Sequence, residues 1–278
     1  MRVSLCTITF RHHLISLDEI AAFARSNGFD GIELWGVHAR SIEHRPERNG
    51  DWLAAFGLGV PMISDYLPLE ADPVELRRRM FALVRVARRW QARKIRTFAG
   101  SKASTRTDAE ERGLIATRLR ELSTLAADHG LSLLAETHPN TLADCGASTL
   151  RLLEEVDHPA FGINFDTLHV WEGGNDPAEF HRLIRPHVGH YHFKNIRARA
   201  DLSVFEPSNV YAPAGRRDGM TRLFEGTVDY GSFLAELAGD GSVEASLEWF
   251  GADCLDVLRH DRRKLAETSA VSLRRTAS

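Results

Sequence analysis

Eight short apolar runs recur along the chain, and a longer stretch with helical or loop character separates each from the next. The runs cover residues 3–9, 31–35, 60–64, 94–98, 132–136, 161–166, 189–194 and 245–248. Strands that alternate with helices are typical of a parallel sheet, and eight parallel strands close a barrel. We therefore predict an α/β fold: a single (β/α)8 TIM-barrel domain over residues 1–278, close to the roughly 250 residues usual for such a domain.

Helix signals stand between the runs. Ser16 and Glu19 have the spacing of a capping box, and Gly28 follows the same amphipathic stretch as a helix stop. Pro73 stands at a position that suits the first turn of another helix. The apolar spacing predicts further helices over residues 73–90, 107–129, 148–156, 177–183 and 230–237.

The overall composition argues against several classes of protein. The formal charge of −3 comes from 35 basic and 38 acidic residues that are interspersed, so no concentrated positive surface for nucleic acid is expected. Three cysteines far apart fit a reducing compartment better than a disulfide framework. No signal-peptide pattern is present, and nowhere do about 18 apolar residues follow one another. We expect a cytoplasmic protein with neither a nucleic-acid nor a membrane partner.

One connecting segment is much longer than the others. Residues 197–228 lie between the seventh run and the next helix, and these about thirty residues are rich in Pro, Gly, Asn and aromatic side chains. Loops of this length in a compact domain are usually functional or disordered. Because Phe205, Tyr211 and Phe224 argue against disorder, we predict an active-site lid over the mouth of the barrel.

Four side chains able to bind a metal lie at the ends of four runs, in LSLLAETH, FGINFD, GHYHFK and ASLEWF. They are Glu136, Asp166, His192 and Glu248. The carboxyl ends of barrel strands meet at one mouth, where polar residues are typically catalytic. Three carboxylates and one imidazole form a hard to borderline set that favours Mn²⁺ or Mg²⁺, with Co²⁺ also suitable, over Zn²⁺. We predict one divalent metal ion with coordination positions left open for substrate oxygens.

Other polar residues share strand faces with these four. Side chains alternate along a strand, so His138 extends the face of Glu136, and Lys194 extends the face of His192. Each could exchange a proton with a substrate or could only support a neighbour by a hydrogen bond. Near a divalent cation in a cleft, a lysine can titrate low enough to act as a base. His169 could orient a ligand, contact substrate or cap the following helix.

Further candidates stand at the ends of other strands. Glu33 and His190 could accept or donate a hydrogen bond to the metal-binding imidazole, which normally needs such a partner. Arg96 could form a bidentate pair with a substrate carboxylate. Tyr66 lies at a similar place and could instead be a packed barrel side chain.

Nine segments carry a resemblance to a known family. They are SLCTITFRH, GFDGIELWG, MISDYL, KIRTFAG, ETHPNTL, HYHFKNI, FEPSNVYA, LFEG and SLEWFG. The chain resembles the xylose isomerase-like barrels, a superfamily of sugar isomerases, epimerases, dehydratases and type IV endonucleases. Within it, these segments look like the 3-dehydroshikimate dehydratases of siderophore pathways. The resemblance covers most of the chain, and only the basic helix at 73–90 and the short tail depart from it.

This resemblance implies a metal-dependent conversion of 3-dehydroshikimate to protocatechuate (3,4-dihydroxybenzoate), with the metal at the four predicted ligands. It also implies a substrate pocket lined by residues that match Tyr66, Arg96, His138, His169, Lys194, Phe205 and Phe250. The ketone of this substrate acidifies its C4 proton, and a chelated metal would stabilise the enediolate before the C5 hydroxyl leaves. We predict that His138 removes the C4 proton and that Lys194 supports the enolate or leaving group, although which of the two is the base stays open. Arg96 is expected to pair with the ring carboxylate.

The same fold also serves other functions. A sugar or inositol isomerase or epimerase could use the same metal site, with Glu136 and Glu248 as bases on opposite faces of one carbon. The aromatic residues Phe205 and Phe250 suit a flat carboxylated ring better than an open polyol. A DNA-repair endonuclease would need more metal-binding histidines and a basic groove, and a non-catalytic barrel would not need the candidate bases. We expect a small-molecule substrate and a monomer or homodimer, while the native metal and the pathway, siderophore assembly or aromatic catabolism, stay open.

Overall fold

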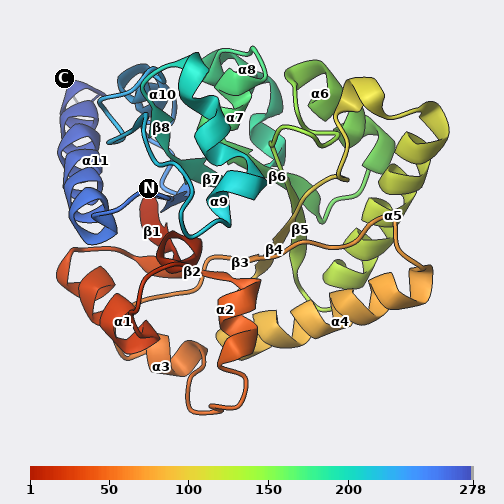
Figure 1. Ribbon diagram of the computed structural model, residues 1–278, viewed down its shortest axis with the longest axis horizontal. Helices are drawn as coiled ribbons and strands as arrows, with labels where there is room; N and C mark the ends of the chain where they lie inside the picture. The colour runs from red at the N-terminus through yellow and green to blue at the C-terminus, as the bar shows by residue number, and fades with distance from the viewer. Residues whose placement is uncertain (277–278) are drawn as a thin grey trace.

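Eight parallel strands form a closed barrel, as predicted (Figure 1). The computed structural model describes the backbone of residues 1–276 and the side chains of residues 1–268. Around the barrel the strands follow one another in chain order, and the last pairs with the first. They are β1 (Arg2–Cys6), β2 (Gly31–Trp35), β3 (Ile63–Ser64), β4 (Lys94–Thr97), β5 (Ser132–Glu136), β6 (Phe161–Asp166), β7 (Val188–Phe193) and β10 (Glu244–Leu247). A short antiparallel pair, β8 (Asn195–Ile196) and β9 (Met220–Thr221), forms a separate sheet.

Two strands are at least two residues shorter than predicted. The first ends at Cys6, because residues Thr7–Phe10 turn into a 3-10 helix, η1. The hydroxyl of Thr7 accepts a hydrogen bond from the backbone N–H of Trp35 at 2.9 Å, so a side chain continues the contact with the neighbouring strand. The third strand is reduced to Ile63–Ser64. Pro61 precedes it and has no N–H to donate to a strand ladder.

The helices surround the barrel on its outside (Figure 1). The predicted helices appear as α1 (Leu17–Ser26), α4 (Pro73–Trp90), α5 (Ala109–Ala127), α6 (Gly146–Val156), α8 (Pro177–Ile184) and α10 (Tyr230–Glu236). Ser16 and Glu19 form the predicted capping box of α1. The unpredicted helices are α2 (Gly36–Ser41), α3 (Gly50–Ala54), α7 (Thr167–Glu172), α9 (Pro207–Val210) and α11 (Cys254–Thr276). No helix within residues 1–276 combines the length and apolar character needed to cross a membrane.

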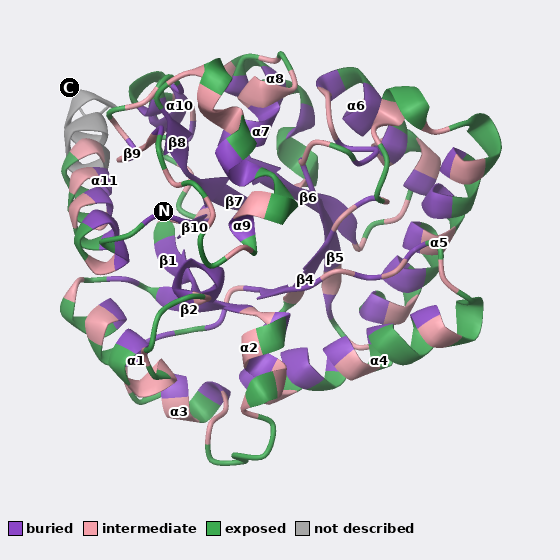
Figure 2. Ribbon diagram, in the orientation of Figure 1, coloured by how far each residue is buried: buried purple, intermediate pink, exposed green. Residues whose placement is uncertain are grey.

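The two faces of the barrel wall have opposite character. Outward-facing strand residues pack beneath the helices and are fully buried, for example Leu5, Ile32, Ile95, Leu133 and Ile163. Figure 2 shows the strands buried along most of their length, whereas the helices expose their outer faces. Most inward-facing residues are polar and equally buried, among them Glu33, Asn164, His190, His192 and Ser246. TIM barrels usually fill this space with branched apolar side chains. Here the apolar core lies between strands and helices, and the inside of the barrel supports a polar site.

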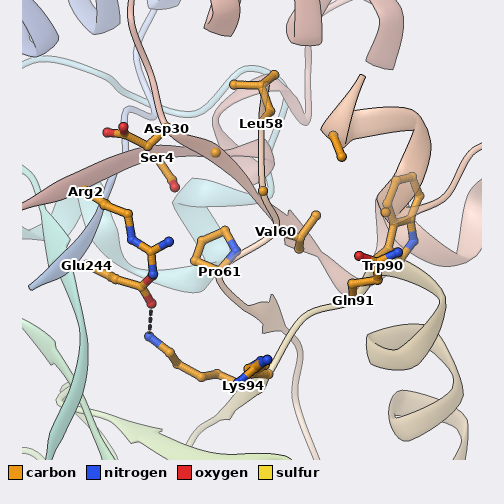
Figure 3. Close-up of a pocket in the computed structure, with 15 residues that line it drawn as sticks. Arg2, Ser4, Asp30, Leu58, Val60, Pro61, Trp90, Gln91, Lys94 and Glu244 are labelled. Atoms are coloured by element: carbon orange, nitrogen blue, oxygen red, sulfur yellow. Dashed lines mark hydrogen bonds and ion pairs between the residues drawn. The ribbon is translucent and has the colours of Figure 1, made fainter. Parts of the chain in front are cut away.

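A hollow of about 280 Å³ lies at the amino-terminal end of the strands, away from the predicted site. Figure 3 shows Glu244 at its wall between Arg2 and Lys94. Lys94 Nζ donates to Glu244 Oε2 at 2.5 Å and to the carbonyl of Gly189 at 2.6 Å, and Arg2 donates to Oε1 of Glu244. Residues at this end of a TIM barrel typically stabilise the fold. We interpret the triad as a link between β1, β4 and β10.

The variant Glu244→Gln is expected to lower the free energy of unfolding by about 1–3 kcal/mol, because it removes the charge that balances the half-buried ammonium of Lys94. Urea unfolding followed by circular dichroism measures this. Glu75→Gln on the exposed face of α4, where Glu75 pairs with Arg78 and Arg79, serves as the matched control and should change stability little. Equal effects of the two variants would contradict the assignment.

Candidate metal centre and active site

The four predicted metal ligands converge at the carboxyl-terminal mouth of the barrel. Glu136 and Asp166 end β5 and β6, His192 lies on β7, and Glu248 follows β10. Each offers one ligand atom, and these four atoms all lie within 4.8 Å of one another. Nδ1 of His192 is 3.5 Å from Oε1 of Glu136 and 3.5 Å from Oε1 of Glu248. All four side chains are buried.

Glu33 on β2 fixes the imidazole of His192. Nε2 of His192 lies 3.0 Å from Oε2 of Glu33, and Nε2 of His190 lies 3.4 Å from the same oxygen. The hydroxyl of Ser64 also donates to Glu33. Burial alone would raise the pKa of Glu33, but His192 and His190 outweigh it and hold that pKa well below its usual range. Nδ1 of His192, which has no hydrogen-bond partner within the described chain, therefore faces the carboxylates as in carboxylate–histidine–metal sites.

Asp166 contacts two different groups through its two oxygens. Oδ1 accepts a hydrogen bond from the backbone N–H of His169 at 3.1 Å and so caps α7. Oδ2 accepts from Nζ of Lys194, which also donates to Oε2 of Glu248 at 2.8 Å. Burial would lower the pKa of Lys194, but Asp166 and Glu248 outweigh it and raise that pKa. These two carboxylates therefore favour the charged ammonium of Lys194.

Arg96 on β4 lies against one of the ligands and two aromatic rings. Its Nε is 2.9 Å from Oε2 of Glu136. Its guanidinium carbon is 5.0 Å from the centroid of the Tyr66 ring and 5.2 Å from that of Phe98. Nη1 donates to the carbonyl of Asp65 at 3.4 Å, and Nη2 makes no hydrogen bond to the part of the chain that is described. One end of the fork thus stays available to a ligand.

His138 extends over the same mouth. Its ring stacks on Phe98 with centroids 4.3 Å apart and lies 4.5 Å from the ring of His169. Nδ1 is 2.8 Å from the carbonyl oxygen of Pro139, and because a carbonyl only accepts, Nδ1 carries the proton. Burial, with a contribution from His169, holds the pKa of His138 well below its usual range. The imidazole is therefore neutral, with the lone pair on Nε2.

The long segment 197–228 folds over the mouth rather than forming one loop. It contains a 3-10 helix, η4 (Arg199–Phe205), then α9 and β9. The hydroxyl of Tyr211 lies 2.8 Å from that of Tyr66, and the ring of Phe205 lies 5.9 Å from that of Phe250. The predicted residues that line the resulting pocket are Tyr66, Arg96, Glu136, His138, His169, Lys194, Phe205, Glu248 and Phe250.

Sequence reasoning missed several lining residues. Ile8, Phe98, Pro207, Val210 and Tyr211 also line this pocket. They are apolar or aromatic, so polar groups at strand ends do not point to them. A usable signal exists, because these residues all lie within segments that carry the family resemblance, such as FEPSNVYA.

The donor set fits a divalent metal ion. Three carboxylate oxygens and an imidazole nitrogen surround one point, and the imidazole nitrogen is buried without a hydrogen-bond partner in the described chain. Among the residues whose side chains are described, four buried carboxylates, counting Glu33, meet two permanent cations here, Arg96 and Lys194. A dication would balance the difference, and oxygen-rich sites suit hard cations.

The comparisons with known proteins agree with this geometry. The family model of the xylose isomerase-like TIM barrel matches residues 21–276. A 3-dehydroshikimate dehydratase of Bacillus anthracis is 47% identical over 271 residues, which are 95% of this chain and 96% of that protein. The crystal structure of the probable 3-DHS dehydratase AsbF, involved in petrobactin synthesis in the same organism, has a TM-score of 0.92 at 47% identity over 96% of this chain and 99% of that chain. An inosose dehydratase of Clostridium botulinum is 26% identical over 129 residues, 46% of this chain and 43% of that protein.

A closed barrel with a ligand set of this kind at its strand ends defines a class of metal-site barrel enzymes. The chain belongs to the xylose isomerase-like TIM-barrel family. Its nearly full-length identity of 47% to a 3-dehydroshikimate dehydratase confirms the narrower resemblance that the sequence segments indicated.

Proposed function

We propose that this protein is a 3-dehydroshikimate dehydratase, which converts 3-dehydroshikimate to protocatechuate with loss of water. The observation that carries the proposal is the 47% identity, over 95% of the chain, to a 3-dehydroshikimate dehydratase. The pocket supports it, because its aromatic walls, its arginine and its neutral histidine suit a flat ring that bears a carboxylate. The reaction needs a base at C4 and a proton donor for the departing C5 hydroxyl.

His138 is the proposed base. Its Nε2 carries a lone pair because Nδ1 is held by the carbonyl of Pro139. The stack on Phe98 fixes the plane of the His138 ring, so the ring loses little rotational freedom when substrate binds. General-base catalysis requires a neutral acceptor within reach of the proton, and the buried imidazole at the pocket wall meets the first condition.

Lys194 is the proposed positive group beside the reacting atoms. Its ammonium lies between Asp166 and Glu248 and lines the pocket. A charged donor at this place stabilises negative charge that develops on an enolate and can give a proton to the leaving hydroxyl. In this proposal His138 is the acceptor and Lys194 is the donor.

The proposed cofactor is one divalent ion held by Glu136, Asp166, His192 and Glu248. Three oxygen donors and one nitrogen favour Mn²⁺ or Mg²⁺, and Co²⁺ is also suitable. When bound, such an ion supplies Lewis acidity toward a carbonyl oxygen and a neighbouring hydroxyl.

Arg96→Lys is expected to raise KM for 3-dehydroshikimate about 10- to 100-fold, the range expected for losing a hydrogen bond to a charged group. Lysine keeps the charge but cannot offer the fork that a carboxylate prefers. Steady-state kinetics measure KM. Metal analysis of the same samples checks that the variant still binds the metal ion, because Glu136, a proposed ligand, contacts Arg96. An unchanged KM would place the carboxylate elsewhere in the pocket.

The test of the function is direct. Purified protein is incubated with 3-dehydroshikimate and Mn²⁺, Mg²⁺ or Co²⁺ in turn, and catechol absorbance is followed. We expect protocatechuate with at least one ion and none in the presence of a chelator. Failure with every ion would contradict the proposal. Parallel incubation with inososes and ketoses tests the alternative isomerase or epimerase.

An epimerase at this site would need two free carboxylate bases on opposite faces of a carbon. Glu136 lies against Arg96, and Glu248 accepts a hydrogen bond from Lys194. Both carboxylates are therefore already engaged by cations, which favours the dehydratase. We further propose that segment 197–228 acts as a lid, and that the protein works in the cytoplasm as a monomer or homodimer.

A further inference from the structure

A further pocket shares no lining residue with the active-site pocket. It measures about 320 Å³ and is lined by residues of the segment after β1, of the start of α1 and of α2, among others. Pockets of this size accept small organic molecules. Its apolar wall consists of Phe10, Ile15, Leu17, Ile20, Leu34 and Ile42.

The charged residues of this pocket are mostly cations. Arg11, Arg45 and Arg48 line it, and Asp18 is its one carboxylate. Oδ1 of Asp18 accepts a hydrogen bond from Nη2 of Arg48 at 2.8 Å, so this acid is already engaged. Arg11 and Arg45 form no ion pair with any residue of the described chain. The pocket therefore has an excess of positive charge next to an apolar wall.

Arg11 shows how incomplete the charge balance is. Its Nε donates to the carbonyl of Val210 at 2.7 Å and its Nη1 to the carbonyl of Ile8 at 3.3 Å. Its guanidinium carbon lies 4.8 Å from the centroid of the Phe250 ring. Carbonyl groups and a ring face stabilise a cation only partly, and a half-buried guanidinium without a counter-ion is energetically unfavourable.

We propose that this pocket binds a small organic acid. Its carboxylate pairs with Arg11 and Arg45, because a guanidinium fork matches a carboxylate, and its hydrocarbon part lies on the apolar wall. An inorganic anion would use only the charges, and a neutral molecule would use only the apolar wall. The ligand therefore needs both features in one molecule.

Arg45 is the better residue to test, because Arg11 also anchors the lid segment. The carbonyl of Val210 lies 3.2 Å from Nε2 of His12 as well as near Arg11, and Tyr211 contacts Tyr66 in the active site. A change at Arg11 would thus disturb catalysis as well. Arg45 is exposed and makes no side-chain hydrogen bond within the described chain, so Arg45→Gln should leave the fold and turnover intact.

The experiment is calorimetric titration of the metal-loaded protein with hexanoate, 1-hexanol and inorganic phosphate at constant ionic strength. We expect hexanoate to bind at one site, and the other two probes to bind at least about tenfold more weakly. Arg45→Gln should weaken hexanoate about tenfold, a size that corresponds to one charge-assisted hydrogen bond. Ser41→Phe, which narrows the pocket from α2, should also weaken it.

Two control variants locate the binding. Arg25→Gln removes an exposed arginine of α1 that does not line the pocket, and hexanoate should bind to it as to the parent protein. His138→Ala alters the active site, and it too should leave hexanoate binding unchanged. No binding of hexanoate, equal binding of phosphate, or an unchanged affinity in both pocket variants would overturn the proposal. A loss of binding in His138→Ala would do the same, because it would place hexanoate in the active site.

Discussion

We expect His138→Ala to lower kcat by about 10²–10⁴-fold, the usual contribution of a general base, and to leave the metal content of the protein unchanged. The reason is geometric: Nε2 of this histidine is a neutral acceptor at the pocket wall, whereas Nδ1 is held by the carbonyl of Pro139. Formation of protocatechuate, followed by its absorbance, gives kcat. Metal analysis of the same preparation separates loss of the base from loss of the ion.

The matched control is His44→Ala, which removes an exposed histidine away from the pocket and should keep normal turnover. Near-normal turnover of His138→Ala with full metal content would transfer the role of base to another group. Lys194 would then be the next candidate, although its ion pairs with Asp166 and Glu248 favour a charged ammonium.

We expect chelation of the proposed metal ion to end turnover and to lower the melting temperature. Binding to the native state alone stabilises a protein, by about 2.7 kcal/mol when the free ion is at 100 times its dissociation constant. Without the dication, four buried carboxylates face two permanent cations, which adds repulsion between like charges. Activity assays and thermal unfolding, with each divalent ion restored in turn, measure both effects.

The variant Glu248→Gln distinguishes stabilisation by an ion bound at the proposed site from stabilisation by ions bound elsewhere. The amide removes one ligand charge, so the same ions should raise the melting temperature of this variant much less. If a thoroughly chelated parent protein kept full activity, the metal-dependent mechanism would be wrong, whatever the outcome of the melting experiment.

The barrel was predictable because its strands are short apolar runs whose spacing survives in the structure. β2, β5 and β6 have the predicted boundaries. The predicted boundaries of β1 and β3 are wrong where backbone pairing between strands stops. At Thr7 a side-chain hydroxyl accepts the hydrogen bond instead of the backbone, and Pro61 has no N–H to donate. The short helix α7 was missed because its cap is Asp166, which was read only as a metal ligand.

The site was predictable in part. The alternation of side chains along a strand placed Glu136 and His138 on one face, and the rule that strand ends meet at one mouth brought together ligands from four strands. Contacts between distant segments have no such periodic signal. The pair of hydroxyls from Tyr66 and Tyr211 joins residues separated by 145 positions, and nothing in either local pattern indicates it. Likewise, sequence spacing cannot show that Lys194 bridges two of the ligands.

Asp166 both caps α7 and belongs to the candidate metal site. This limits which substitutions there can abolish activity without also weakening the fold. An Asn there would still start α7, because its side-chain oxygen can cap a helix, but it would remove a negative charge from the ligand set. An Ala would remove both the cap of α7 and the negative charge. We therefore expect relatives that have become inactive yet remain folded to carry Asn, Ser or Thr at this position. The residue at the position of Asp166 could therefore identify inactive relatives in a sequence survey.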